Sequence, residues 1–85
     1  MTYQVEIKEP AEKKLKKLDK SKSEEILNQI DKLKKYPQKY GKPLGGRLSG
    51  FWQLRSGKYR IWYTIENKVV YVRAVKHKEE AEEYY

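Results

Sequence analysis

Residues 51–76, FWQLRSGKYRIWYTIENKVVYVRAVK, decide the fold because they have the pattern of three short strands in succession. Hydrophobic and aromatic residues alternate with polar ones, as in half-buried strands, and two polar stretches interrupt the alternation. The strands are expected at residues 51–55, 59–66 and 69–76, with turns at residues 56–58 and 67–68. Short turns join antiparallel neighbours, so this stretch predicts a three-stranded meander.

The N-terminal segment predicts a further strand followed by a helix. Tyr3, Val5 and Ile7 alternate with polar residues. A helix is then expected to begin at Pro10, since a helix tolerates proline in its first turn. The core-facing stripe of this helix is Ala11, Leu15 and Leu18.

A second helix is expected to follow the polar break at residues 19–22. Ser21 and Glu24 have the spacing of a capping box, and Pro37 ends the helix because the residue before a proline avoids helical geometry. The apolar face of this helix is Ile26, Leu27, Ile30 and Leu33. Residues 37–50 contain two prolines and four glycines, which indicates an ordered loop with little regular structure.

The order β-α-α-β-β-β predicts a single α+β domain over residues 1–85, in which a helical hairpin packs on a small antiparallel sheet. Residues 77–85 are rich in helix formers and are expected to form a short C-terminal helix or a frayed tail. A chain of this length can build one modest hydrophobic core.

Alternation within the strands predicts which side chains face the helices. The inward residues are expected to be Ile61, Tyr63, Ile65, Val70, Val72 and Ala74. The outward residues are expected to be Arg60, Trp62, Thr64, Tyr71, Arg73, Val75 and His77. Phe51, Gln53 and Arg55 share one side, and the strand register decides which side that is.

The formal charge of +8 is concentrated in the middle of the chain. Residues 37–78 contain ten Lys and Arg residues, including all four arginines, against the single acid Glu66. Arginine matches phosphate oxygens with paired hydrogen bonds, and rings on the same sheet face would offer surfaces for unstacked bases. A polyanion, and RNA in particular, is the expected partner, while ordinary solvation accounts for the lysines before residue 37. For Trp62 and Tyr71, ordinary packing within the protein is an equal alternative to a role in stacking on bases.

Several other functions are excluded or disfavoured. The chain has no cysteine, so it can form neither a disulfide nor a thiolate metal site, and we expect no metal and no cofactor. The only histidine is His77, both aspartates lie in the helical hairpin, and no phosphate-binding glycine motif occurs. No apolar run approaches the roughly 20 residues that span a bilayer, so we expect a cytoplasmic protein without a membrane partner.

Residues 48–63, LSGFWQLRSGKYRIWY, resemble the signature of the RelE/ParE toxin superfamily. The core of the resemblance is Tyr59-Arg60-Ile61 together with Tyr63, and the Leu-Ser-Gly-Phe-Trp segment is similar to the YoeB branch. The ending at residues 75–84 resembles that of RelE-like toxins. The resemblance extends over essentially the whole chain and implies a RelE-like fold and a RelE/YoeB-like mRNA interferase.

The resemblance also implies roles for individual residues. Arg60 would stabilise charge on the scissile phosphate and His77 would act as general acid, while Lys78 stands where many relatives have arginine and Tyr84 matches a C-terminal tyrosine. The expected RNA-binding residues are Arg47, Arg55, Lys58, Arg73 and Lys76. YoeB-like proteins use a glutamate base before the Leu-Ser-Gly segment, but this chain has no acid between Asp31 and Glu66. The general base is therefore unassigned, with Lys78 and Tyr84 as candidates.

The implied function is that of the toxin of a type II toxin–antitoxin system, a ribosome-dependent endonuclease that cuts mRNA in the ribosomal A site. Its implied protein partner is a cognate antitoxin, RelB-like or YefM-like. One alternative is a ParE-like inhibitor of DNA gyrase without nuclease activity. Another is a chain that has kept the fold and RNA affinity but lost toxicity. The codon preference and the oligomeric state are left open.

Overall fold

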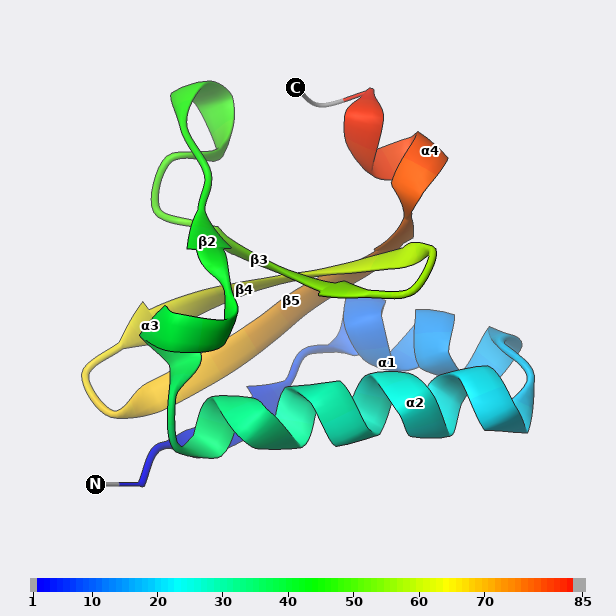
Figure 1. Cartoon of the computed structure of the whole chain (residues 1–85), viewed down its shortest axis with the longest axis horizontal. Helices are drawn as coiled ribbons and strands as arrows, with labels where there is room; N and C mark the ends of the chain where they lie inside the picture. Colours follow the sequence, from blue (N-terminus) through cyan, green and yellow to red (C-terminus); the bar gives the residue numbers. More distant parts are fainter. Residues whose placement is uncertain (1, 84–85) are drawn as a thin grey trace.

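A computed structural model describes residues 2–83 as a five-stranded sheet with two helices packed on one face (Figure 1). The strands are β1 (Gln4–Ile7), β2 (Lys42–Pro43), β3 (Trp52–Ser56), β4 (Tyr59–Glu66) and β5 (Val69–His77). The helices are α1 (Glu9–Lys17), α2 (Lys20–Asp31), α3 (Pro37–Tyr40) and α4 (Lys78–Glu82), with 3-10 turns η1 (Lys32–Lys34) and η2 (Gly46–Leu48). The α+β class, the meander and a short C-terminal helix are confirmed.

The strand order is β1-β5-β4-β3-β2. The meander pairs are antiparallel, and Asn67 adopts a φ of 57° in the tight turn between β4 and β5. β1 instead lies parallel to β5, with Val5 beside Val70, so the expectation of a wholly antiparallel sheet is corrected. The helical hairpin supplies the long connection that a parallel arrangement requires, and it leaves β1 at the edge of the sheet.

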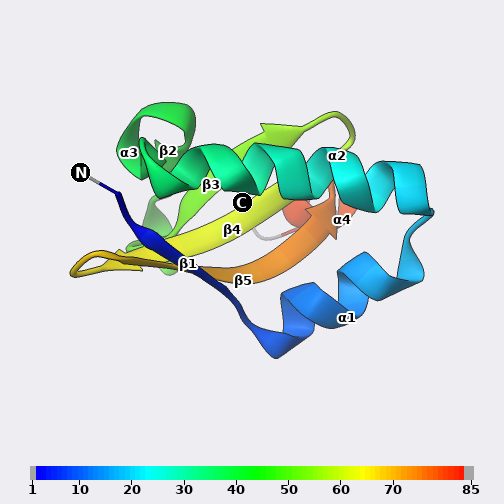
Figure 2. The ribbon, with the colours of Figure 1, turned by 90° about the horizontal axis from the view of Figure 1, so that it is seen from below.

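The core lies between the sheet and the α1–α2 hairpin. Both helices lie beneath the sheet in Figure 1, and in Figure 2, seen from below, α2 crosses in front of the strands while α1 lies beside β5. The fully buried side chains of this core come from the predicted inward positions Ile61, Tyr63, Val70 and Val72 and from the helix stripes. Leu27 departs from the predicted stripe, since it is 42% exposed and lines a hollow with Val5 of β1.

The connection between α1 and α2 is shorter than the predicted break at residues 19–22, since only residues 18 and 19 separate the two helices. α2 begins at Lys20 after Asp19, and no side chain caps its first turn, so the predicted capping box of Ser21 and Glu24 is wrong. The Ser23 hydroxyl donates a 2.6 Å hydrogen bond to the Leu15 carbonyl instead. The Leu15 carbonyl also accepts a 3.3 Å bond from the Leu18 amide, so the Ser23 hydroxyl ties the start of α2 to a carbonyl at the end of α1.

The predicted loop at residues 37–50 has more regular structure than expected, since it forms α3, β2 and η2. Pro37 is buried, and its carbonyl accepts a hydrogen bond from the buried Tyr63 hydroxyl. Gly41 then passes directly over the same hydroxyl. A tertiary contact therefore fixes this segment, which is why local composition did not reveal its structure.

A β-bulge in β5 changes the predicted side-chain directions. Tyr63 pairs with Val72 but Trp62 pairs with Ala74, so Arg73 is an extra residue opposite β4. An extra residue reverses the faces of the residues that follow it. Val75 therefore lies in the core and Ala74 on the other face, and the predictions for both residues were wrong.

Within residues 2–83, none of the helices is both long and apolar enough to cross a membrane.

Candidate nucleic-acid interface

The sheet face opposite α1 and α2, here called the open face, lies between two rising segments. Residues 41–50 stand on one side of it and α4 on the other (Figure 1). The register puts Gln53 and Arg55 of β3 on this face, because they pair with Trp62 and Arg60 of β4. The sequence did not decide which side of the sheet Gln53 and Arg55 occupy, and the register shows that they lie on the open face.

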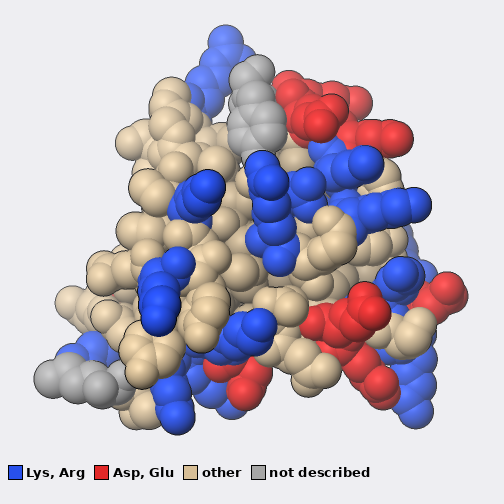
Figure 3. Space-filling model, viewed as in Figure 1, with Lys and Arg blue, Asp and Glu red and all other residues tan. Residues whose placement is uncertain are grey.

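Three cations form a row across the open face. Arg55 pairs with Arg60, and Arg60 pairs with Lys76, so one cation from each of β3, β4 and β5 stands side by side. Directly opposed side chains on neighbouring strands are about 5 Å apart at Cβ, and like charges there destabilise the sheet. This cation row is therefore unfavourable for folding and well suited to binding a polyanion. Figure 3 shows Lys and Arg gathered over this part of the molecule.

Arg60 is held in place by its own turn. Its Nη1 donates to the carbonyl of Gly57 at 2.9 Å and to the carbonyl of Tyr59 at 3.0 Å. Two hydrogen bonds to one nitrogen restrict the guanidinium before any ligand arrives. Such preorganisation lowers the entropy lost when an anion binds.

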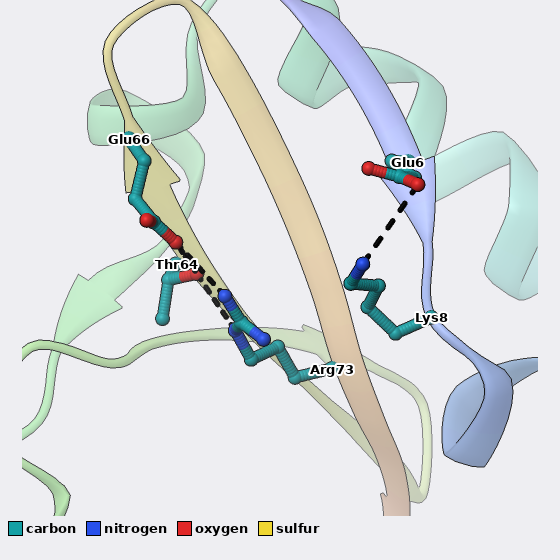
Figure 4. A network of polar contacts seen from close by, with 5 residues as sticks. All are labelled: Glu6, Lys8, Thr64, Glu66 and Arg73. Atoms are coloured by element: carbon teal, nitrogen blue, oxygen red, sulfur yellow. Dashed lines mark hydrogen bonds and ion pairs between the residues drawn. The ribbon is translucent and has the colours of Figure 1, made fainter.

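The other end of the open face is charge-balanced (Figure 4). Arg73 Nη2 lies 2.8 Å from Glu66 Oε2, and its Nε donates to the Thr64 hydroxyl at 2.9 Å. The Tyr71 ring has two cationic neighbours, Lys8 and Arg73, each with its charged group 5.2 Å from the ring centroid. Arg73, an expected RNA-binding residue, is therefore engaged within the protein, and the Tyr71 ring already has cationic neighbours.

Trp62 lies on the open face but is only 4% exposed. Its indole nitrogen donates a 2.9 Å hydrogen bond to the Gln53 side chain. A ring this deeply buried cannot receive a stacked base. Of the two alternatives for Trp62, ordinary packing is the correct one.

His77 does not share a face with Arg60, contrary to the sequence prediction. It pairs with Tyr59, and the two rings meet edge to face with centroids 5.6 Å apart. The bulge at Arg73 is the cause, because it leaves Lys76 on the open face and turns His77 to the side of Val75. His77 also caps α4: its Nδ1 accepts from the Glu79 amide at 3.3 Å, which puts the proton of the neutral ring on Nε2.

The remaining predicted site residues are spread over the edges of the open face. The Lys78 amide donates to the Lys58 carbonyl at 2.7 Å, which brings these two exposed residues together beside the end of the cation row. Arg47 is exposed in η2, on the opposite rising segment. Tyr84 lies outside the described residues.

Sequence reasoning missed the contacts that position α4. Glu80 accepts hydrogen bonds from the His77 amide and from Lys14 Nζ of α1, each at 3.1 Å. The bond from the His77 amide and then that from Lys14 lower the pKa of the Glu80 carboxyl, and Lys76 adds a smaller electrostatic effect. The spacing of His77 and Glu80 is that of a capping box, which was the available signal. Across residues 2–83, no group of three or more His, Cys, Asp or Glu residues could hold a metal ion.

Comparison with known proteins places the chain in a toxin family. A family model described as the ParE toxin of the type II toxin–antitoxin system parDE matches residues 5–82. The chain belongs to the ParE toxin family. The predicted RelE/ParE superfamily is thereby confirmed, and the protein is a toxin of the type II toxin–antitoxin class. Among curated proteins, none matches the chain.

Solved structures place the ParE-family toxin close to RelE proteins. A chain of the toxin–antitoxin complex RelBE2 from Mycobacterium tuberculosis is 29% identical with a TM-score of 0.85, over 91% of this chain and 99% of that one. A mutant of Escherichia coli RelE in the free state is 27% identical with a TM-score of 0.78, over 99% and 92% of the two chains. The YoeB/ParE toxin from Agrobacterium tumefaciens shares the fold at 18% identity, with a TM-score of 0.73 over 87% and 96%.

Proposed function

We propose that this toxin acts on RNA, as an endonuclease that cuts mRNA in the ribosomal A site. The observation that carries the proposal is the cation row of Arg55, Arg60 and Lys76, which the sheet holds in register despite mutual repulsion. Single-stranded RNA supplies closely spaced phosphates that would neutralise all three charges. The likeness to RelE structures supports the same reading.

In the proposed reaction the 2′-hydroxyl of the RNA attacks the neighbouring phosphate, and negative charge grows on the phosphate oxygens. Arg60 would stabilise that charge, because its guanidinium is already oriented by the Gly57 and Tyr59 carbonyls. His77, with its ring protonated at both nitrogens and its bond from the Glu79 amide broken, would donate the Nε2 proton to the leaving 5′-oxygen from the edge of the sheet, with Lys78 beside it. The general base is left unassigned, with Lys78 and Tyr84 as the candidates.

The test is purified toxin added to a translating extract, with cut sites mapped on the mRNA by primer extension. Arg60→Ala should lower cutting by at least about a hundredfold, since removing one preorganised charge-stabilising group typically costs that much. Lys22→Ala, an equal charge change on the outer side of α2, should leave cutting unchanged. Intact mRNA in an extract whose translation the toxin has stopped would refute the proposed nuclease.

A matched pair of substitutions separates the two roles of His77. His77→Asn keeps a side-chain acceptor for the Glu79 amide but cannot donate a proton to the leaving group as an acid, whereas His77→Ala removes both. If His77 is the general acid, both variants should lose cutting by about 10²–10⁴. Full activity in His77→Asn with loss in His77→Ala would show that the residue only caps α4.

A second candidate function is inhibition of DNA gyrase without nuclease activity. The match to the ParE family model favours it, and so does the separation of Arg60 and His77 on opposite faces of β4 and β5. A supercoiling assay run beside the mRNA assay distinguishes the two. Loss of supercoiling with intact mRNA would select the gyrase inhibitor.

We further propose that the toxin is neutralised by a RelB-like or YefM-like antitoxin, because the RelBE2 structure is a toxin–antitoxin complex. An apolar hollow of about 310 Å³ between β1 and α2, lined in part by Val5, Leu27 and Ile30, offers a surface for such a partner. Co-expression of the cognate antitoxin should restore growth. Leu27→Asp in the toxin should weaken the complex.

A further inference from the structure

A second cationic and aromatic surface lies at the corner formed by η1 and α3, away from the core. Tyr36 is 52% exposed and Tyr40 is 42% exposed, which makes them two of the three large hydrophobic side chains exposed among residues 2–83. Their ring centroids are 6.1 Å apart, and the planes meet at 62°. The α3 patch is defined here as Lys32, Lys35, Tyr36, Lys39 and Tyr40.

Each exposed ring of the α3 patch has its own lysine. Lys39 Nζ lies 5.4 Å from the centroid of Tyr36, and Lys32 Nζ lies 5.5 Å from the centroid of Tyr40. A base that stacks on either ring would therefore bring its phosphate within reach of an ammonium group. This pairing of ring and cation suits a nucleotide better than it suits an apolar partner.

The two rings are held outward by the fold. Pro37, between them, is buried, and its carbonyl accepts the hydrogen bond from the Tyr63 hydroxyl. α3 is thus anchored to the core through Pro37, while Tyr36 and Tyr40 remain in solvent. Core packing does not account for their exposure, and the anchored turn presents them in a fixed arrangement.

Two hollows adjoin Tyr40, one within the α3 patch and one between Tyr40 and β3. The first, of about 310 Å³, is lined by Thr2, Asp31, Lys32, Lys34, Lys35, Tyr36 and Tyr40. The second, of about 180 Å³, is lined by Tyr40, Lys42, Gln53, Leu54 and Arg55. Tyr40 lines both hollows, and Arg55 begins the cation row. In Figure 3, separate blue side chains with tan residues between them lie over the left part of the molecule, where α3 lies in Figure 1.

We propose that the α3 patch binds a single-stranded stretch of nucleic acid that continues from the cation row. Bases would stack on Tyr40 and Tyr36, and the phosphates between them would lie against Lys32, Lys35 and Lys39. This inference rests on the proposed action on RNA and extends it, since the toxin then holds several nucleotides on one side of the scissile phosphate. The recognition is tolerant of sequence, because every base has a face that can stack.

The test measures the affinity of the whole chain for a fluorescein-labelled 12-nucleotide 2′-O-methyl RNA by fluorescence anisotropy. This probe has no free 2′-hydroxyl and cannot be cut, so binding is measured apart from activity. Tyr36→Ala and Tyr40→Ala should each weaken binding by about fivefold to a hundredfold. Tyr36→Phe and Tyr40→Phe keep the rings and should change affinity by less than about twofold. The exposed positions make misfolding a minor concern, and circular dichroism checks it.

The outcomes separate this inference from the proposed function. Weakening by Arg60→Ala but not by the two Tyr→Ala changes would overturn the α3 patch and leave the cation row supported. Weakening by the Tyr→Ala changes alone would support the patch and count against the cation row. Polyglutamate of equal charge supplies anions without bases, so equal affinity for it would overturn base stacking and identify the patch as a docking surface for an acidic protein. No binding of the RNA probe at all would overturn the α3 patch, whereas the proposed nuclease stands or falls with the mRNA assay in the translating extract.

Discussion

The hydroxyl of Tyr63 is the most constrained polar group of the core. The side chain is fully buried, and its hydroxyl donates to the Pro37 carbonyl, which fixes the start of α3. Burial disfavours the charged phenolate and raises the pKa of Tyr63 from 10.0 to about 12. The native state therefore keeps its proton between pH 10 and 12 while the unfolded chain loses it.

Because the pKa of Tyr63 differs between the folded and unfolded states, the stability of the domain should depend on pH in the alkaline range. The stability that Tyr63 contributes is fully present below pH 10 and falls as the pH rises toward 12, by roughly 1.4 kcal/mol per pKa unit of difference. Tyr63→Phe removes the titration but also leaves the Pro37 carbonyl unsatisfied, at a cost of about 1–2 kcal/mol. The wild-type chain should thus be more stable than Tyr63→Phe at pH 7, and the advantage should vanish near pH 11. Urea unfolding of both chains at pH 7 and pH 11 measures the difference in their free energies of unfolding. The same difference at both pH values would contradict the prediction.

Gly41 provides a second residue-scale prediction. A Cβ at this position would collide with the Tyr63 hydroxyl, although the backbone φ of −104° is open to any residue. Gly41→Ala should therefore destabilise the domain by about 1–3 kcal/mol through overpacking alone. The double variant Gly41→Ala/Tyr63→Phe removes the colliding oxygen and should lose less stability than the sum of the two single changes. Strict additivity would show that the collision is not the cause.

At the scale of the element, α4 is positioned by polar contacts of Glu80 together with the burial of Ala81. The helix has five residues and buries Ala81, while Glu80 connects it both to its own N-terminus and to Lys14 of α1. Because those bonds lower the pKa of Glu80 in the folded state, their contribution is present at neutral pH. It is lost as the pH falls below the ordinary value of 4.5 and through the lowered one.

Neutralising Glu80 should therefore loosen α4 while leaving the rest of the sheet intact. Glu80→Gln should increase amide exchange at residues 79–83 at pH 7, whereas Glu82→Gln at the other end of the helix should change it little. Acidifying the wild-type chain well below pH 4.5, through the lowered pKa of Glu80, should reproduce the Glu80→Gln pattern. Unchanged exchange in Glu80→Gln would mean that α4 is held by Ala81 and its neighbours.

At the scale of the whole molecule, the open face has two electrostatic ends. The end near Arg73 and Glu66 is balanced by ion pairs, and the end with Arg55, Arg60 and Lys76 is a row of cations next to the acidic α4. A polyanion that binds the cation row releases counterions from its phosphates, so its affinity depends on salt.

The dependence can be measured for each cation. For a single-stranded probe, the slope of log affinity against log salt concentration should fall by about 0.7 for every phosphate contact removed. Arg55→Ala and Arg60→Ala should each lower the slope by that amount, and Lys76→Ala should lower it by less, because Lys76 also interacts electrostatically with Glu80. Arg73→Ala, whose charge is paired with Glu66, should lower it by less. Equal effects at all four positions would show that the ligand spreads over the entire face.

The sequence by itself determined the class of the fold, the meander, the helical hairpin and the concentration of charge between residues 37 and 78. These features depend on local sequence. Alternation of apolar and polar residues indicates a strand, an apolar stripe at helical spacing indicates a helix, and the net charge follows from counting charged residues. The same local signals gave Ile61, Tyr63, Val70 and Val72 as inward residues, and the burial of all four confirms them. The motif resemblance added the superfamily, which the family model confirms.

Only the tertiary structure decided which cations stand together. The bulge at Arg73 has no sequence signal that we could identify, yet it turns His77 away from Arg60 and leaves Lys76 beside it. Likewise α3 depends on a hydrogen bond between Pro37 and Tyr63, residues that are 26 positions apart. Strand register and long-range contacts depend on how separate segments pack against each other, so alternation within one strand cannot specify them.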